Sequence, residues 1–143
     1  TLAAVLCTSA VAASIDASES GTLMHGPTYM ANPLACSVAS ANLDLLTGSD
    51  WRANVARINA ALTQGLARAA GLEHVIDVRT IGAVGVIQLD HPVDMTAATS
   101  IALEHGVWVR PFRDLIYTMP PYICTDAELA DITAALVAAA GAA

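Results

Sequence analysis

The chain has 143 residues and a formal net charge of −7, from six Lys or Arg residues against 13 Asp or Glu residues. Such an acidic chain is repelled by phosphate backbones and anionic lipid, which excludes nucleic-acid binding and membrane-surface roles. Hydrophobic residues make up 55% and charged residues 13%, against about 25% charged in typical soluble domains, so we expect a partner or a larger body to cover much of the surface.

All six basic residues are arginine, so the chain alone lacks the side-chain amine that Schiff-base chemistry needs. Its three cysteines are an odd number without a CxxC pair, which favours a reducing cytoplasm over a disulfide framework. The chain begins at Thr1 rather than Met, so we expect a processed product or a fragment. Its apolar runs are shorter than the roughly 18 residues of a transmembrane helix, so we expect no membrane span.

The N-terminal part predicts a strand, two helices and an unusual loop. Residues 2–7 are a continuous apolar run, typical of a short buried strand, and residues 10–17 predict a short helix. Residues 23–33 are rich in Gly and Pro yet apolar, which indicates a buried functional loop. Asn32 and Pro33 predict a helix start. This helix ends at Gly48, and its apolar stripe is Leu34, Val38, Ala41 and Leu45.

A second helix is predicted from a cap at Ser49 to a stop at Gly71. Its buried stripe is Trp51, Val55, Ile58, Leu62 and Leu66.

After residue 72 the hydrophobic period changes from helical spacing to two. Residues 75–80 and 84–89 predict a hairpin, and residues 107–112 and 115–119 predict a second strand pair. A helix over residues 96–105 separates the pairs, and a capping box of Thr125 and Glu128 begins the last helix. The buried face of that helix is Leu129, Ile132, Leu136 and Ala140. The order β-β-α-β-β-α predicts a small α/β sandwich.

Two segments carry candidate binding chemistry. In the segment from His25 to Thr28, glycine allows close approach and threonine offers a hydroxyl and a backbone N–H, which suits an oxyanion such as phosphate. An ordinary turn is the alternative. Arg110 shares one strand face with Trp108 and Phe112, and a buried arginine needs an anion. Its partner is either a ligand carboxylate or an internal acid that forms a structural salt bridge.

The remaining reactive residues predict no site. The four histidines, at positions 25, 74, 91 and 105, stand at none of the spacings typical of metal ligands, so we expect no metal site. Cys124 lies beside a helix cap without an identifiable base, and no GxSxG or GxGxxG motif is present.

The two candidate segments carry a family resemblance. Residues 25–36, HGPTYMANPLAC, resemble the cofactor-phosphate motif of class III aminotransferases. Residues 106–112, GVWVRPF, and 115–123, LIYTMPPYI, narrow the resemblance to the biotin-pathway branch of that family. Members of this branch are fold-type I, pyridoxal 5'-phosphate-dependent homodimers. They transfer an amino group from S-adenosylmethionine to 8-amino-7-oxononanoate.

The resemblance also implies roles for individual residues. Pro27 and Thr28 would bind the cofactor phosphate in the partner subunit's active site, where Gly26 would contact substrate. Arg110 would hold the terminal carboxylate of the substrate, and Tyr117 would line the substrate pocket.

The resemblance spans essentially the whole chain and matches the C-terminal third of the family. Residues 1–48 would be the end of the large cofactor-binding domain with a connecting helix, and residues 49–143 the small C-terminal α/β domain. The family's lysine would precede Thr1, so the chain would hold no catalytic residue and be inactive without the missing N-terminal portion. The alternatives are a stand-alone, non-catalytic α/β interaction domain, or part of another class III aminotransferase.

Overall fold

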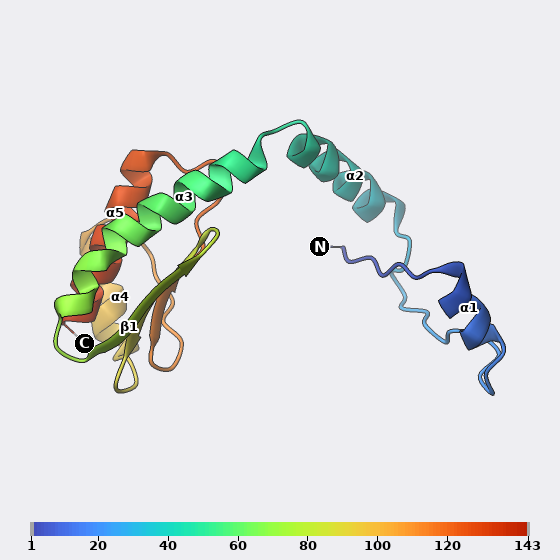
Figure 1. The fold of residues 1–143 in the computed structure, drawn as a ribbon, viewed down its shortest axis with the longest axis horizontal. Helices are drawn as coiled ribbons and strands as arrows, with labels where there is room; N and C mark the ends of the chain where they lie inside the picture. The colour runs from blue at the N-terminus through green and yellow to red at the C-terminus, as the bar shows by residue number, and fades with distance from the viewer. Residues whose placement is uncertain (1, 143) are drawn as a thin grey trace. The chain divides into compact units, whose positions relative to one another are not determined.

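The computed structural model describes residues 2–142 (Figure 1). The chain divides into two compact units, with the boundary in the sequence between Ser49 and Asp50. The first unit holds helices α1 (Ser9–Asp16) and α2 (Pro33–Thr47). The second holds a three-stranded sheet with its covering helices. No helix among residues 2–142 combines the length and the apolar character that a membrane crossing requires.

Helix α2 begins and ends where the sequence predicts. The Asn32 side chain accepts a hydrogen bond from the Ala35 N–H at 3.0 Å, and Pro33 occupies the first turn, where its missing N–H has no consequence. Gly48 is the C-cap residue. Both predicted ends of this helix are confirmed, because capping depends only on residues a few positions apart.

The buried strand predicted for residues 2–7 is wrong for this structure. Residues 2–8 are coil, and Val5 is 99% exposed. A strand needs neighbours to pair with its N–H and C=O groups, and no described residue forms a ladder with this segment.

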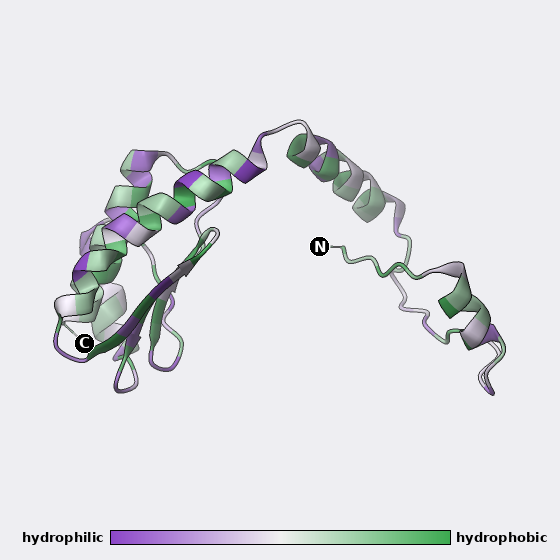
Figure 2. Cartoon of the chain, in the orientation of Figure 1, coloured by the Kyte–Doolittle hydropathy of each residue, from purple (hydrophilic) through white to green (hydrophobic). Residues whose placement is uncertain are grey.

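The predicted burial of the first unit is also not observed. The loop over residues 23–31 is exposed, and so is the predicted α2 stripe, with Leu34 75% and Val38 61% exposed. Among residues 2–49 no side chain is buried, although α2 is largely coloured as hydrophobic in Figure 2. The first unit therefore presents an apolar surface without a core of its own.

The second unit is an antiparallel sheet with helices packed on it. Its elements are α3 (Trp51–Leu66), the 3₁₀ helix η1 (Ala67–Gly71), β1 (Val75–Ile81), β2 (Val84–Leu89), α4 (Met95–Glu104), β3 (Leu115–Thr118) and α5 (Asp126–Gly141). The strand order is β1-β2-β3, and the register places Ile87 between Val78 and Ile116. Helices α3 and α5 pack against each other and against the sheet (Figure 1).

The core of this unit lies between the sheet and the helices. Leu66, Ile87, Ile116 and Leu136 are fully buried there, and Ile58 packs with Leu62 and Leu129 in a smaller cluster. The predicted hairpin and the α5 face are confirmed. Of the predicted α3 stripe, Ile58, Leu62 and Leu66 are buried, whereas Trp51 and Val55 are only half-buried. The α-helix ends at Leu66, and a 3₁₀ helix continues to the predicted stop at Gly71. Periodicity locates these elements because each element turns one face toward the buried interior of the unit.

The second predicted strand pair forms only in part. Residues 107–111 are coil, and a single bridge joins Phe112 to Leu115, so the sheet has three strands rather than four. Pro111 has no N–H to donate to a ladder. The Val107 N–H donates instead to the Ala102 carbonyl at the end of α4.

The N-cap of α3 is Asp50 rather than the predicted Ser49. The Asp50 carboxylate accepts from the Ala53 N–H at 3.0 Å, whereas the Ser49 hydroxyl donates backwards to the Leu46 carbonyl. Because Ser and Asp are both good N-cap residues and stand side by side here, the sequence alone does not decide which of them caps α3.

We expect Asp50→Ala to lower the free energy of unfolding by about 0.5–2 kcal/mol, the usual cost of a lost cap. The matched variant Ser49→Ala leaves the Ala53 N–H paired and is expected to change stability by less than about 0.5 kcal/mol. Urea unfolding followed by circular dichroism measures both. Equal losses in the two variants would contradict the assignment of the cap.

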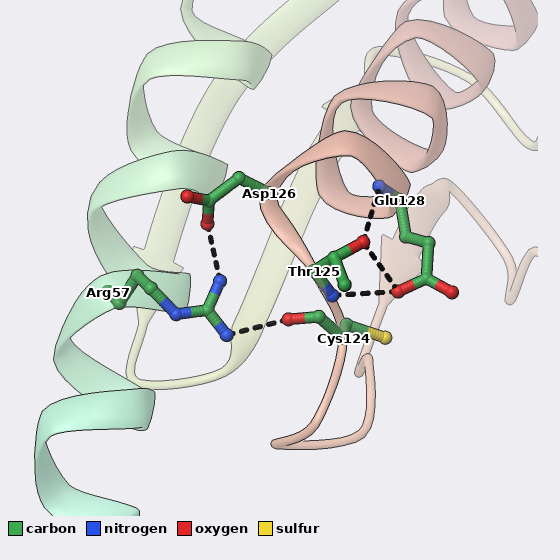
Figure 3. Close-up of polar contacts among 5 residues, drawn as sticks. All are labelled: Arg57, Cys124, Thr125, Asp126 and Glu128. Carbon is green, nitrogen blue, oxygen red and sulfur yellow. Dashed lines mark hydrogen bonds and ion pairs between the residues drawn. The ribbon is translucent and has the colours of Figure 1, made fainter.

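The start of α5 is held by the predicted capping box and by an ion pair (Figure 3). The Thr125 N–H donates to the Glu128 carboxylate at 2.7 Å, and the Glu128 N–H donates back to the Thr125 hydroxyl. Arg57 of α3 donates to the Asp126 carboxylate and, at 2.6 Å, to the Cys124 carbonyl. These contacts join the two helices at one end.

The capping box makes stability depend on pH. The hydrogen bonds from the Thr125 backbone and then its hydroxyl lower the pKa of Glu128 below its ordinary value of 4.5. Ionised Glu128 therefore stabilises the fold at neutral pH, and this contribution is lost as pH falls through the lowered pKa. We expect Glu128→Gln to be less stable than wild type at neutral pH, with the gap closing below pH 4.5. Urea unfolding at several pH values measures the gap, and one that stays constant into acid would disprove this role.

Candidate functional site

The loop that holds Gly26, Pro27 and Thr28 leads into α2. The Pro27 carbonyl accepts a hydrogen bond from the Met30 N–H at 3.0 Å, which closes a turn with Thr28 at its first central position. A second contact, from the Asn32 N–H to the Tyr29 carbonyl at 3.2 Å, connects this turn to the helix cap. The turn therefore holds Thr28 a few residues before the start of α2.

The donors of this loop suit an oxyanion. Among residues 2–142, no hydrogen bond engages the Thr28 N–H or its hydroxyl, and Thr28 is an exposed residue. A side chain at Gly26 would meet nothing within 4 Å, so the backbone is open on that side. Two free donors beside an open glycine fit a phosphate group. Pro27 has no N–H, so its contribution is to stiffen the turn.

Arg110 lies in the coil between α4 and β3. Trp108 and Phe112 are 69% and 60% exposed, and Arg110 is exposed beside them, whereas Val109 and Pro111 face the core. The alternation that places Arg110 between two aromatic residues on one face is confirmed. The expectation that Arg110 is buried is wrong, because its side chain lies on the solvent side of this coil segment.

The electrostatics at Arg110 leave its guanidinium available. Within residues 2–142, none of the ion pairs involves Arg110. An internal acid, the structural alternative for this residue, is therefore not observed. The guanidinium has a planar fork that can bind a carboxylate through two parallel hydrogen bonds, and the flanking aromatic rings present apolar surface beside it.

Tyr117 stands in the middle of β3, half-buried and paired with Val86. Its neighbour Ile116 faces the core, so Tyr117 projects from the opposite face of the sheet.

Gln88 of β2 donates to the Asp114 carboxylate at 2.7 Å. This bond, with a further one from the Asp114 backbone, lowers the pKa of Asp114 and keeps it ionised.

The five candidate residues are divided between the two units. Gly26, Pro27 and Thr28 belong to the first unit, and Arg110 and Tyr117 to the second. A groove of about 720 Å³, whose lining includes Arg57, Arg68 and Asp126, contains none of the five.

A cluster that the sequence analysis missed lies at the open end of the β1–β2 hairpin. His74, Asp90 and His91 meet there, and hydrogen bonds from His91 and then His74 lower the pKa of Asp90. The sequence separates His74 from the other two residues. The adjacent Asp-His pair, opposite a histidine at the far end of a predicted hairpin, was the available signal.

Comparison with known families and proteins gives consistent matches along the chain. Residues 1–140 match the family described as "Aminotransferase class-III". The adenosylmethionine-8-amino-7-oxononanoate aminotransferase of Mycobacterium leprae is 57% identical over 140 residues, which are 98% of this chain and 32% of that protein. Its counterpart in Corynebacterium glutamicum is 50% identical over 138 residues, 96% of this chain and 33% of that protein. The chain thus spans about a third of these relatives.

Solved structures agree with the sequence matches. An amine transaminase from an uncultivated Pseudomonas species, in its PLP-bound form, superposes with a TM-score of 0.80 at 30% identity, covering 90% of this chain and 32% of that one. An adenosylmethionine-8-amino-7-oxononanoate aminotransferase from Methanocaldococcus jannaschii has a TM-score of 0.74 at 30% identity. That match covers 85% of this chain and 30% of the other.

Proposed function

The chain belongs to the class-III aminotransferase family, and on that premise we propose that it is the C-terminal third of a 7,8-diaminopelargonic acid aminotransferase of biotin biosynthesis. The observation that carries the proposal is the 57% identity to the M. leprae relative over nearly the whole chain. The reaction would transfer an amino group from S-adenosylmethionine to 8-amino-7-oxononanoate. Residues 1–48 would complete the large domain, and residues 49–143 would form the small domain.

The proposed division of labour follows from the side chains. Pyridoxal phosphate supplies the electron sink for amino transfer in this family. The Thr28 N–H and hydroxyl would hold its phosphate, with Pro27 keeping the turn rigid and Gly26 leaving room for substrate. Arg110 would bind the substrate carboxylate between Trp108 and Phe112, which would pack against its aliphatic chain. Tyr117 would line the same pocket.

The chain by itself would not catalyse the reaction. Its six basic residues are all arginine, so it has no lysine to hold the cofactor covalently. The apolar surface of the first unit, where Val5 and Leu34 are 99% and 75% exposed, would be covered by the missing N-terminal portion and by a second subunit of a homodimer. Its cysteines are free thiols, which suits a cytoplasmic enzyme.

Reconstitution tests this proposal. The chain is co-expressed with the N-terminal portion of the M. leprae relative, which is the part of that protein that this chain does not match. The purified complex is assayed for visible cofactor absorbance and, by mass spectrometry, for amino transfer from S-adenosylmethionine to 8-amino-7-oxononanoate. We expect a dimer of the complete enzyme with both signals, and neither signal from the chain alone.

The two alternatives give different results in the same assay. A folded complex that transfers an amino group to another acceptor, but not to 8-amino-7-oxononanoate, would identify a different class III aminotransferase. A folded complex with no bound cofactor and no transfer would favour a stand-alone interaction domain.

A further inference from the structure

Three side chains of types that can ligate a metal ion lie together at the open end of the β1–β2 hairpin. His74 directly precedes β1, and Asp90 and His91 directly follow β2. The pairing of Val75 with Leu89 brings the two strand ends together, and the Asp90 N–H donates to the His74 carbonyl at 2.9 Å. The sheet itself therefore fixes the backbone that carries all three side chains.

The side chains of this cluster point toward one another. The His91 Nδ1 lies 2.6 Å from one Asp90 oxygen and the His74 Nδ1 3.3 Å from the other, with the two rings 5.0 Å apart and perpendicular. The backbone of His74 has a φ of 70°, in the left-handed region that non-glycine residues rarely adopt.

The spacing of the ligand atoms is close to that of a metal site. One nitrogen from each histidine and one Asp90 oxygen all lie within 4.8 Å of one another. In a four-coordinate, tetrahedral zinc shell two ligand atoms lie about 3.4 Å apart, since zinc bonds to nitrogen and oxygen are about 2.1 Å long. The side chains are roughly half exposed, so small rotations can close the difference.

We propose that His74, Asp90 and His91 form a binding site for one divalent transition-metal ion, and that this ion is Zn²⁺. Two imidazole nitrogens and one carboxylate oxygen are a donor set that zinc accepts, and water completes the four-coordinate shell. The same donors disfavour Mg²⁺ and Ca²⁺, which prefer oxygen ligands alone. The ion would take the place of the contacts that now join the two Nδ1 atoms to Asp90.

Zinc titration of the chain tests the site. The protein is prepared without a histidine tag, with Cys7, Cys36 and Cys124 replaced by serine so that no thiol competes, and it is stripped with chelator. Calorimetry with ZnCl₂ measures the stoichiometry and affinity. NMR of the imidazole groups identifies the histidines that the metal perturbs.

The variants are His91→Ala, His74→Gly and, as the matched control, His105→Ala, whose imidazole lies outside the cluster. Glycine replaces His74 because it tolerates the left-handed backbone. Circular dichroism verifies that each variant folds.

We expect one zinc ion per chain and signals that shift at His74 and His91. Removing either histidine should weaken zinc binding at least about tenfold. Losing a group that only hydrogen-bonds to a metal ligand already costs about that much. His105→Ala should bind as the parent does. No binding at millimolar zinc, or an affinity unchanged in both His91→Ala and His74→Gly, would show that the cluster is only a hydrogen-bonded set.

Discussion

Replacing Arg110 by alanine in the reconstituted enzyme is expected to lower kcat/KM for 8-amino-7-oxononanoate roughly tenfold to 150-fold. A hydrogen bond to a charged group contributes about 1.5–3 kcal/mol, and each 1.4 kcal/mol is a factor of ten. Arg110 is exposed and makes no ion pair within residues 2–142, so its removal should leave the fold intact. Steady-state kinetics with varied 8-amino-7-oxononanoate measure the loss.

The matched control for this prediction is Arg113→Ala, the same change of charge three residues away. It is expected to keep near-parental kinetics, because Arg113 has no part in the proposed carboxylate site. Cofactor absorbance should persist in both variants, since the proposed phosphate donors lie at Thr28. If an acceptor without the carboxylate loses as much activity as 8-amino-7-oxononanoate, or if the cofactor is lost, Arg110 does not bind the carboxylate.

Gly65→Ala is expected to destabilise the second unit by about 1–3 kcal/mol, the usual cost of overpacking. Gly65 lies in α3 where that helix meets α5, and an added Cβ would lie 2.6 Å from the Thr133 Cβ and 2.7 Å from its Cγ2. Thr133 is 4% exposed and its hydroxyl already donates to the Ala130 carbonyl, so it has little freedom to move. Helix propensity alone would favour alanine by about 1 kcal/mol. A loss therefore reports packing, and urea unfolding measures it.

Gly71→Ala is the control for this packing effect. A Cβ at Gly71 would meet nothing within 4 Å, so we expect a change of less than about 0.5 kcal/mol. In a Thr133→Ala background, Gly65→Ala should cost less, because the methyl and hydroxyl are gone. Wild-type stability of Gly65→Ala would show that α3 and α5 do not approach this closely.

The sequence predicted which residues stand beside Arg110 but not how exposed Arg110 is. The grouping of Arg110 with Trp108 and Phe112 followed from the sequence, because Val109 and Pro111 between them turn toward the core. The exposure of Arg110 did not follow from the sequence, because an apolar stretch predicts burial without showing which side of the segment faces the core. The strand predicted for residues 2–7 was wrong for a related reason: apolar character predicts burial but does not supply a partner strand.

The amino-acid sequence by itself determined the elements whose causes are local. The cap at Asn32, the capping box of Thr125 and Glu128, and the hairpin over residues 75–89 depend on contacts between near neighbours in the chain, so short patterns reveal them. Only the tertiary structure decided that Gly65 meets Thr133 and that His74 meets Asp90 and His91. Those contacts join residues 16 to 68 positions apart, and they arise from how the helices and strands pack, which local propensity does not encode.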